Sequence, residues 1–159
     1  MGRKGTTGES RFWHIPTCAA PGTGPTVAEI AAGTELTPYS TRDGFDAPQT
    51  ASQIDASDAS TRRNKSIPGN IEAGTVTMKL YRDAVSADDD AWAALPLDTA
   101  GYIVEREFGG TAAVAAAQKV NVFKGSVSSR SPQAWGAEAR KFVVEWAVET
   151  LYEGVAVQA

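Results

Sequence analysis

Residues 46–73 read DAPQTASQIDASDASTRRNKSIPGNIEA, and this stretch decides how the rest of the chain is interpreted. Its only large apolar side chains are Ile54, Ile67 and Ile71. A compact domain rarely contains so long a segment with so little to bury. The segment is therefore either disordered or ordered by something outside the chain. Assembly with other copies becomes the leading question, ahead of chemistry.

The remainder of the chain has the composition of one mainly β domain. It has 159 residues, of which 42% are hydrophobic, and a chain of this size buries roughly two-thirds of its unfolded surface. Ala, Thr and Val are plentiful while Leu is scarce, which favours strands over a helical bundle. Fifteen Gly and eight Pro provide many turns. No internal repeat or second domain is visible.

Alternation of apolar and polar residues predicts two clear strands, at 75–82 and 141–149. Val76, Met78 and Leu80 share one face of the first strand. One face of the second consists of Phe142, Val144, Trp146 and Val148. Shorter strands are predicted at 11–15, 36–41, 102–108, 118–127 and 155–157, with a tight turn at Asp43-Gly44, a turn at 67–73 and a loop at 128–136. If the ambiguous segment 53–63 pairs with 75–82, the two form a long hairpin that projects beyond the core.

Helix signals occur twice. Thr26 and Glu29 have the spacing of a capping box, with Gly33 at the left-handed position that ends a short helical turn. Ser86 caps a second predicted helix. Its acidic triplet, residues 88–90, is better explained by the helix dipole than by a cation site. Trp92 and Leu95 share a face there and Pro96 ends it, whereas 112–117 is either a helical turn or a loop.

Charge and cysteine content exclude several classes of protein. The net charge is −4, so tight phosphate binding through a massed basic surface is not expected. The lone Cys18 rules out an internal disulfide, and no apolar run is long enough to span a membrane. Two basic groups are either solvated or contact an acidic neighbouring subunit: Arg3, Lys4 and Arg11, and Arg62, Arg63 and Lys65.

No constellation of residues indicates catalysis. His14 is the only histidine, too few for a zinc site with Cys18, and its neighbours Phe12, Trp13 and Ile15 predict a structural role. The G-x-S-x-G nucleophile motif is absent. The Gly-rich segment 21–25 lacks the Lys and Ser/Thr of a phosphate loop. We therefore predict no catalytic, cofactor-binding or metal-binding residue and no cofactor, and the protein is not expected to be an enzyme.

Several segments, taken in order, resemble those of one family of structural proteins. They are RFWHIPT at 11–17, AEIAAGTELT at 28–37, RDG at 42–44, IDASD at 54–58, MKLYRD at 78–83, DDDAW at 88–92, GYIV at 101–104 and KFVVEWAV at 141–148. Together they resemble the major tail protein, or tail-tube subunit, of long-tailed bacteriophages, and most closely those of phages that infect actinobacteria. The match is one of order and pattern over nearly the whole chain. The Ala-rich segment 112–117 and the basic Arg62, Arg63 and Lys65 group depart from it.

The resemblance implies a β-sandwich or partly closed barrel with one short α-helix and a long projecting hairpin. Residues 1–10 would be a flexible arm and 11–159 a single β domain, within which neighbouring subunits order 46–73. Subunits would form hexameric rings that stack into a hollow tube, through which DNA passes without specific binding. Further partners implied are the tape-measure, terminator and distal tail proteins. The protein would belong to the virion tail and assemble in the host bacterial cytoplasm.

Two sets of residues follow as candidates for this role. The predicted lining of the lumen is Asp55, Ser57, Asp58 and Thr77. The predicted contacts between subunits are Arg62, Arg63, Lys65, Ile67 and Ile71. A slip of one residue in register would exchange the faces of a strand, so the lumen-facing side stays open. The alternative functions are a soluble β-sandwich or barrel that binds a ligand, and a head–tail connector or tail-terminator ring.

Overall fold

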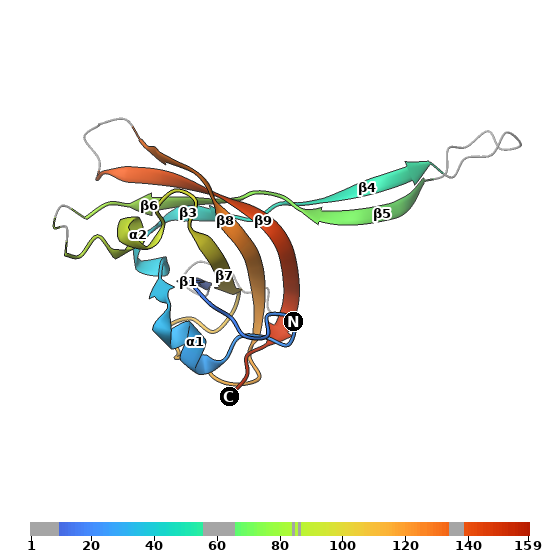
Figure 1. The fold of residues 1–159 in the computed structure, drawn as a ribbon, viewed down its shortest axis with the longest axis horizontal. Helices are drawn as coiled ribbons and strands as arrows, with labels where there is room; N and C mark the ends of the chain where they lie inside the picture. The colour runs from blue at the N-terminus through green and yellow to red at the C-terminus, as the bar shows by residue number, and fades with distance from the viewer. Residues whose placement is uncertain (1–9, 56–65, 84, 86, 134–138) are drawn as a thin grey trace, which may run out of the picture.

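The computed structural model describes residues 10–55, 66–83, 85, 87–133 and 139–159, and of 53–55 and 66–73 the backbone alone (Figure 1). The strands are β1 (Arg11–Ile15), β2 (Thr34–Glu35), β3 (Ser40–Asp46), β4 (Gln49–Asp55), β5 (Ser66–Ala73), β6 (Val76–Tyr81), β7 (Ala100–Arg106), β8 (Lys119–Pro132) and β9 (Lys141–Ala156). The helices are α1 (Val27–Ala32), the 3₁₀ turn η1 (Thr37–Tyr39) and α2 (Asp90–Ala94).

Seven of these strands form one antiparallel sheet that curls into a half-barrel. The strand order is β2-β1-β7-β8-β9-β6-β3. β8 and β9 are the two longest strands, and register shifts along their pairing let them bend through both halves of the curl (Figure 1). The predicted mainly β fold is confirmed.

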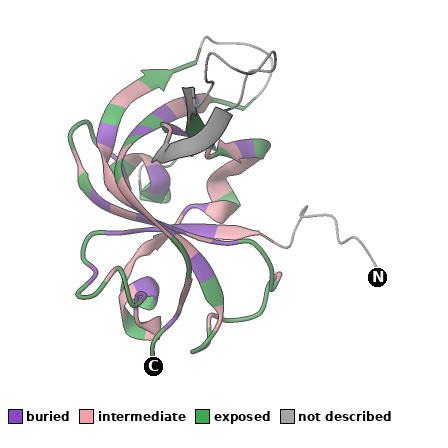
Figure 2. Ribbon diagram, turned by 90° about the vertical axis from the view of Figure 1, so that its right-hand side faces the viewer, coloured by how far each residue is buried: buried purple, intermediate pink, exposed green. Residues whose placement is uncertain are grey.

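Apolar side chains pack on both faces of the curled sheet. The cluster inside the curl contains Val76, Met78, Leu80, Phe142, Val144 and Trp146, all buried, and α2 contributes Ala91 to it. A second cluster joins Trp13, Val104 and Val120 to Ile30 of α1. The alternation of burial along the strands is visible in Figure 2. The predicted inward faces of 75–82 and 141–149 are therefore confirmed, with Val148 only partly buried.

The curl brings together strands that are far apart in the sheet order. The rings of Phe12 on β1 and Phe45 on β3 lie 4.9 Å apart between centroids. Phe45 also meets Phe123 of β8 edge-on, at 6.1 Å. Aromatic contacts close this seam of the half-barrel where no strand pairing joins β1 to β3.

A separate two-stranded ribbon, β4 paired with β5, projects from the body (Figure 1). The expected hairpin is present, but its partner strands differ from the prediction. Residues 67–73 lie in β5 and do not form a turn, while the 75–82 strand joins the main sheet as β6. Pro68 sits inside β5 opposite Gln53. Proline is compatible with a ribbon because each strand there has an unpaired edge.

Two turn predictions and one strand prediction are wrong. Asp43-Gly44 lies within β3, where the pairing with β6 jumps from Ser40 to Phe45 and forms a bulge. Gly33 follows α1 in an extended conformation (φ −79°), and it is needed because a Cβ there would lie 2.6 Å from the carbonyl oxygen of His14. The expected strand at 36–41 is mainly the 3₁₀ turn η1, which Pro38 favours.

The remaining differences concern where elements begin and end. β8 continues to Pro132, so much of the predicted loop 128–136 is strand, and 155–156 prolong β9 instead of forming a separate strand. Ser86 lies outside the described residues, and α2 begins after Asp89, whose side chain makes no capping bond. The capping box of Thr26 and Glu29 is confirmed. Segment 112–117 is a loop.

Candidate assembly surfaces

One section of the sheet has an exposed edge on both sides. It consists of β3, β6, the first half of β9 and the second half of β8. β3 is the last strand of the sheet. β7 pairs with β8 only as far as Ser126, and backbone bonds from Asp98 and Thr99 reach Val127. Among the described residues, 128–132 therefore have a strand partner on one side alone, like β3.

On the outer face of this section, one row of polar side chains crosses all four strands. Thr77 lies opposite Asp46 on one side and Glu145 on the other, and Glu145 lies opposite Ser129. The hydroxyl of Ser129 donates to Glu145 Oε2 at 2.8 Å. Because Val76 and Met78 are buried inside the curl, Thr77 and its row face away from the core. Thr77 is thus flanked by two carboxylates.

The structure places only part of the predicted site. Thr77 is half-buried on β6, as described. Asp55 ends β4 opposite Ser66, while Ile67 and Ile71 in β5 lie opposite Ile54 and Ala51. The other predicted residues lie outside the described part of the chain, namely Ser57, Asp58, Arg62, Arg63 and Lys65.

Sequence reasoning missed the residues that surround Thr77. Glu145 could have been predicted, because the alternation in 141–149 places it on the face opposite Phe142 and Trp146. The position of Asp46 could not be predicted, because the bulge in β3 shifts the register of its pairing with β6. Ser129 was missed because residues 128–132 of β8 are three Ser, one Arg and one Pro, a composition that indicates a loop.

The root of the ribbon is held by a close backbone contact. The N–H of Gly74 donates to the carbonyl oxygen of Pro48 at 2.9 Å. A Cβ at Gly74 would lie 2.8 Å from that oxygen. β3 with β4 and β6 with β5 thereby continue as one long hairpin across a short break at 47–48 and 74–75.

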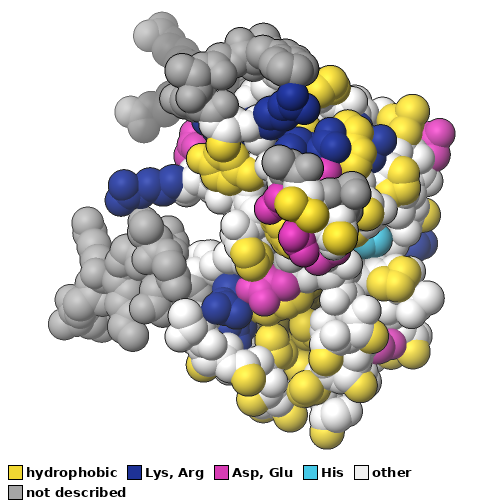
Figure 3. Space-filling view, turned by 90° about the vertical axis from the view of Figure 1, so that its left-hand side faces the viewer, with side chains coloured by type: hydrophobic (Ala, Val, Ile, Leu, Met, Phe, Trp, Pro, Cys, Tyr) yellow, Lys and Arg dark blue, Asp and Glu magenta, His cyan; other side chains and the backbone are white. Residues whose placement is uncertain are grey.

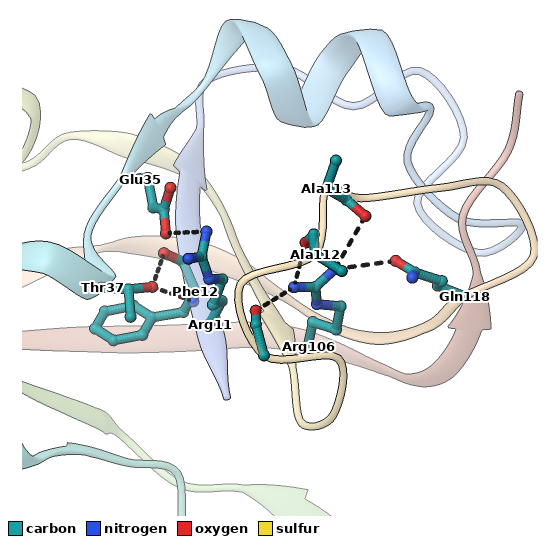
Figure 4. Close-up of polar contacts among 9 residues, drawn as sticks. Arg11, Phe12, Glu35, Thr37, Arg106, Ala112, Ala113 and Gln118 are labelled. Atoms are coloured by element: carbon teal, nitrogen blue, oxygen red, sulfur yellow. Dashed lines mark hydrogen bonds and ion pairs between the residues drawn. The ribbon is translucent and has the colours of Figure 1, made fainter. Parts of the chain in front are cut away.

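A buried guanidinium organises the loop after β7. Arg106 is 1% exposed, and its Nη2 donates to the carbonyl oxygens of Gly110 (2.8 Å) and Ala112 (2.9 Å). Its Nη1 donates to Gln118 Oε1 at 3.2 Å (Figure 4). These contacts fix the segment that follows β7. They replace the carboxylate that a buried arginine ordinarily requires.

A second cationic cluster lies at the end of the molecule opposite the ribbon. The guanidinium carbons of Arg82 and Arg130 lie 3.8 Å and 3.6 Å from the centroid of the Trp92 ring. Arg82 Nε also donates to Asp89 at 2.6 Å. Figure 3 shows positive and negative side chains intermingled on this end. The cluster attaches α2 to β6 and β8 through charge–aromatic contacts.

Two titratable groups are perturbed by burial. His14 is 6% exposed, and its ring meets Trp146 edge-on at 5.7 Å. Burial lowers the pKa of His14, so the ring is neutral inside the curl, as expected of a structural histidine. Burial also raises the pKa of Glu105, whose carboxylate accepts from Asn121 Nδ2 at 3.3 Å.

Within the described residues, no group of three or more His, Cys, Asp or Glu side chains is arranged to hold a metal ion. None of the helices described here is long and apolar enough to cross a membrane.

Comparison with known proteins agrees with the β architecture. The model of the phage tail tube protein family matches residues 3–159, and the chain belongs to this family. It is a structural protein of the phage tail and not an enzyme. A search of curated proteins found no match. Among solved structures, the chain resembles one in the six-fold symmetrised cryo-EM structure of the anti-feeding prophage baseplate. The TM-score is 0.56 with 9% identity over 95% of both chains, a likeness of fold alone.

Proposed function

We propose that this protein forms hexameric rings that stack into the hollow tail tube through which DNA enters the host. One observation carries the proposal: among the described residues, the section β3-β6-β9-β8 has two exposed edges and a polar row across its outer face. Exposed strand edges are a hazard in a protein that stays monomeric. Closing a sheet into a barrel removes its edges.

Strand direction supports this closure. Successive pairings from β3 to β6, β9 and β8 are all antiparallel, so β3 and β8 run in opposite directions. When β8 of one copy lies beside β3 of the next, that pair is antiparallel as well. An even number of strands in each copy lets the alternation continue around any ring of identical copies. A heterologous contact of this kind closes into a ring when the rotation between copies permits.

The outer face of the section would line the lumen. Thr77 is there, with Asp46 and Glu145 beside it, and we retain Asp55, Ser57 and Asp58 as further candidates. Lysine or arginine that neutralises phosphates strengthens DNA binding through counterion release. Carboxylates and hydroxyls do not, and the Nζ of Lys79 on the same face lies 3.4 Å from Asp43 Oδ2, so the row around Thr77 would let DNA slide.

The ribbon would contact neighbouring subunits through Arg62, Arg63, Lys65, Ile67 and Ile71. A two-stranded ribbon alone is marginally stable in water, so neighbours would order 46–73 within the single domain 11–159. Residues 1–10 would form an arm. The lumen would carry DNA without specific binding. Other partners would be the tape-measure, terminator and distal tail proteins. The tube would assemble in the host cytoplasm, and we expect the closest relatives in phages of actinobacteria.

The edge-to-edge contact is tested by cross-linking. Arg42→Cys on β3 and Ser131→Cys on β8 place one thiol on each edge, and a bis-maleimide of about 10 Å spans two neighbouring strands. The double variant should give a covalent ladder that ends at six copies. Each single variant should give no ladder and serves as the control. Dimers from either single variant would show like edges pairing, which contradicts the ring.

Electron microscopy separates the remaining functions. Negative staining of the purified protein, with light scattering, should show long hollow tubes. A lone ring that does not polymerise would instead indicate a connector or terminator. A monomer that persists at high concentration, even with tail initiation proteins added, would indicate a ligand-binding module.

A further inference from the structure

A cleft lies along the seam where β1 and η1 face β3. Its volume is about 410 Å³, and the Phe12 and Phe45 rings that close the seam line it. Glu105 and Glu107, at the end of β7, also line the cleft. An aromatic surface beside carboxylates is the environment that favours an ammonium or guanidinium group.

In the described part of the chain, Glu105 and Glu107 have a polar partner but no cation paired with them. Asn121 Nδ2 donates to Glu105 Oε2 at 3.3 Å and to Glu107 Oε1 at 3.0 Å. An amide carries no charge, and the ion pairs found among the described residues include neither glutamate. Burial and the neighbouring Glu107 raise the pKa of Glu105. A cation placed here would relieve that cost.

Two arginines, Arg11 and Arg42, also line the cleft. Arg11 is paired with Glu35, with Nη1 and Oε1 3.1 Å apart (Figure 4). Arg42 is exposed on β3. Within the described ranges, neither arginine forms an ion pair with Glu105 or Glu107, which leaves these two carboxylates open to a basic group from another segment.

A basic segment begins at the rim of this cleft. Ser10 lines it, and the Ser10 hydroxyl donates to the carbonyl oxygen of Glu107 at 3.1 Å. The residues before it, MGRKGTTGE, include Arg3 and Lys4. From Ser10, the six intervening peptide units let Lys4 reach at most about 20 Å. Both cations are therefore within reach of Glu105 and Glu107 of the same chain.

We propose that the seam cleft is a binding site for a basic extended segment, and that its occupant is residues 1–9 of the same chain. Arg3 and Lys4 would lie beside the partly buried Phe45 with their charges toward Glu105 and Glu107. The inference goes beyond the proposed tube, because it concerns a single chain.

Zero-length cross-linking of the full-length protein tests this site. A carbodiimide joins an amine to a carboxylate only where the two are in contact. We expect a link from Lys4 to Glu105 or Glu107, identified by mass spectrometry, and its yield should fall several-fold at 1 M salt, where the Debye length is about 3 Å. In an equal mixture of ¹⁴N- and ¹⁵N-labelled protein, the two linked peptides should carry the same label.

Substitutions of the glutamates and of the basic residues test the proposed contact directly. Glu105→Gln with Glu107→Gln should abolish the Lys4 link, and exposed Asp98, which lies before the opposite end of β7, should not acquire one. In the Arg3→Gln, Lys4→Gln variant, the pKa of Glu105 measured by ¹³C NMR should rise further, because the stabilising cations are gone. Links from Lys4 to Asp98 in equal yield, links only between differently labelled chains, or an unchanged pKa of Glu105 would each overturn the proposal.

Discussion

The body and the ribbon of this protein are made of the same kind of hairpin but are stabilised differently. In the body, β6 packs Val76, Met78 and Leu80 into a shared core, each 0% exposed. In the ribbon, β4 and β5 form a two-stranded sheet of their own. Most of the stability of a sheet comes from packing one face on another layer. The hairpin continues beyond the core of its own chain, so we expect other molecules to supply the packing that the ribbon lacks.

The largest effect is expected from a charge inside the body. Leu80→Asp buries an unpaired carboxylate and removes apolar contacts, and it should lower the free energy of unfolding by about 5 kcal/mol. Val76→Asp should act similarly. Circular dichroism during urea denaturation measures the change, and both variants should fail to fold or to form tubes.

Thr77→Asn is the matched control, because it places a polar side chain of similar size on the opposite face of the same strand and adds no third carboxylate beside Asp46 and Glu145. Its free energy of unfolding should stay within about 0.5 kcal/mol of the wild-type value. Normal tubes from Leu80→Asp would mean that β6 is not the core strand described here, and the contrast between body and ribbon would fail.

Local sequence patterning determines how much of the contrast between body and ribbon can be predicted from the sequence alone. Period-two alternation around Val76 and Trp146 was sufficient to place β6 and β9 and their inward faces. The ribbon has no apolar alternation, so its existence was inferred from the lack of apolar residues, and its partner strand was misjudged. Pro68-Gly69-Asn70 has turn composition, yet in a ribbon with two open edges nothing excludes proline.

The assembly surface was harder to predict than the core. An exposed edge depends on where a neighbouring strand stops, and that is a property of the whole sheet. β7 leaves β8 at Ser126, which no local feature of 128–132 announces. Arg106 shows the same limit, because its partners are backbone carbonyls of a loop that has no sequence signature.

The next largest effect on stability is expected from replacing the buried guanidinium of Arg106. Arg106→Leu removes the donor for the carbonyl oxygens of Gly110 and Ala112 and should lower the free energy of unfolding by about 3 kcal/mol. Hydrogen exchange should accelerate most in the loop that follows β7. Arg42→Leu, an exposed arginine, should change stability by less than about 0.5 kcal/mol. Equal effects of the two substitutions would contradict the organising role of Arg106.

A substitution at the root of the ribbon should have a smaller effect, and the body should be little changed. Gly74→Ala places a Cβ 2.8 Å from the Pro48 carbonyl oxygen, so the backbone must shift. We expect a local cost of about 1 kcal/mol, little change in the urea midpoint of the body, and slower tube growth by light scattering. Gly22→Ala is the control, because its Cβ would make ordinary contacts, the nearest at 3.6 Å. Tubes growing at the wild-type rate from Gly74→Ala would argue against a fixed root.

The smallest effect is a pH dependence confined to the body. Burial lowers the pKa of His14 in the folded state below its ordinary value near 6.5, so the unfolded chain binds a proton more readily. Stability should therefore decline as the pH falls below about 6.5, with a slope of at most about 1.4 kcal/mol per pH unit. Burial raises the pKa of Glu105, which acts in the opposite direction as the pH falls. His14→Phe removes the histidine contribution alone.

The difference between wild type and His14→Phe from pH 7.5 to 5.5 therefore isolates the ring. Amide exchange should show where the acid acts. Protection in β6 and β9, which enclose the core next to His14 and Trp146, should fall in the wild type and hold in the variant. Protection in β4 and β5 should be the same in both proteins, because the ribbon lies outside the core that buries the ring. A ribbon that loses protection together with the body, and recovers it in His14→Phe, would show that the two regions unfold as one unit.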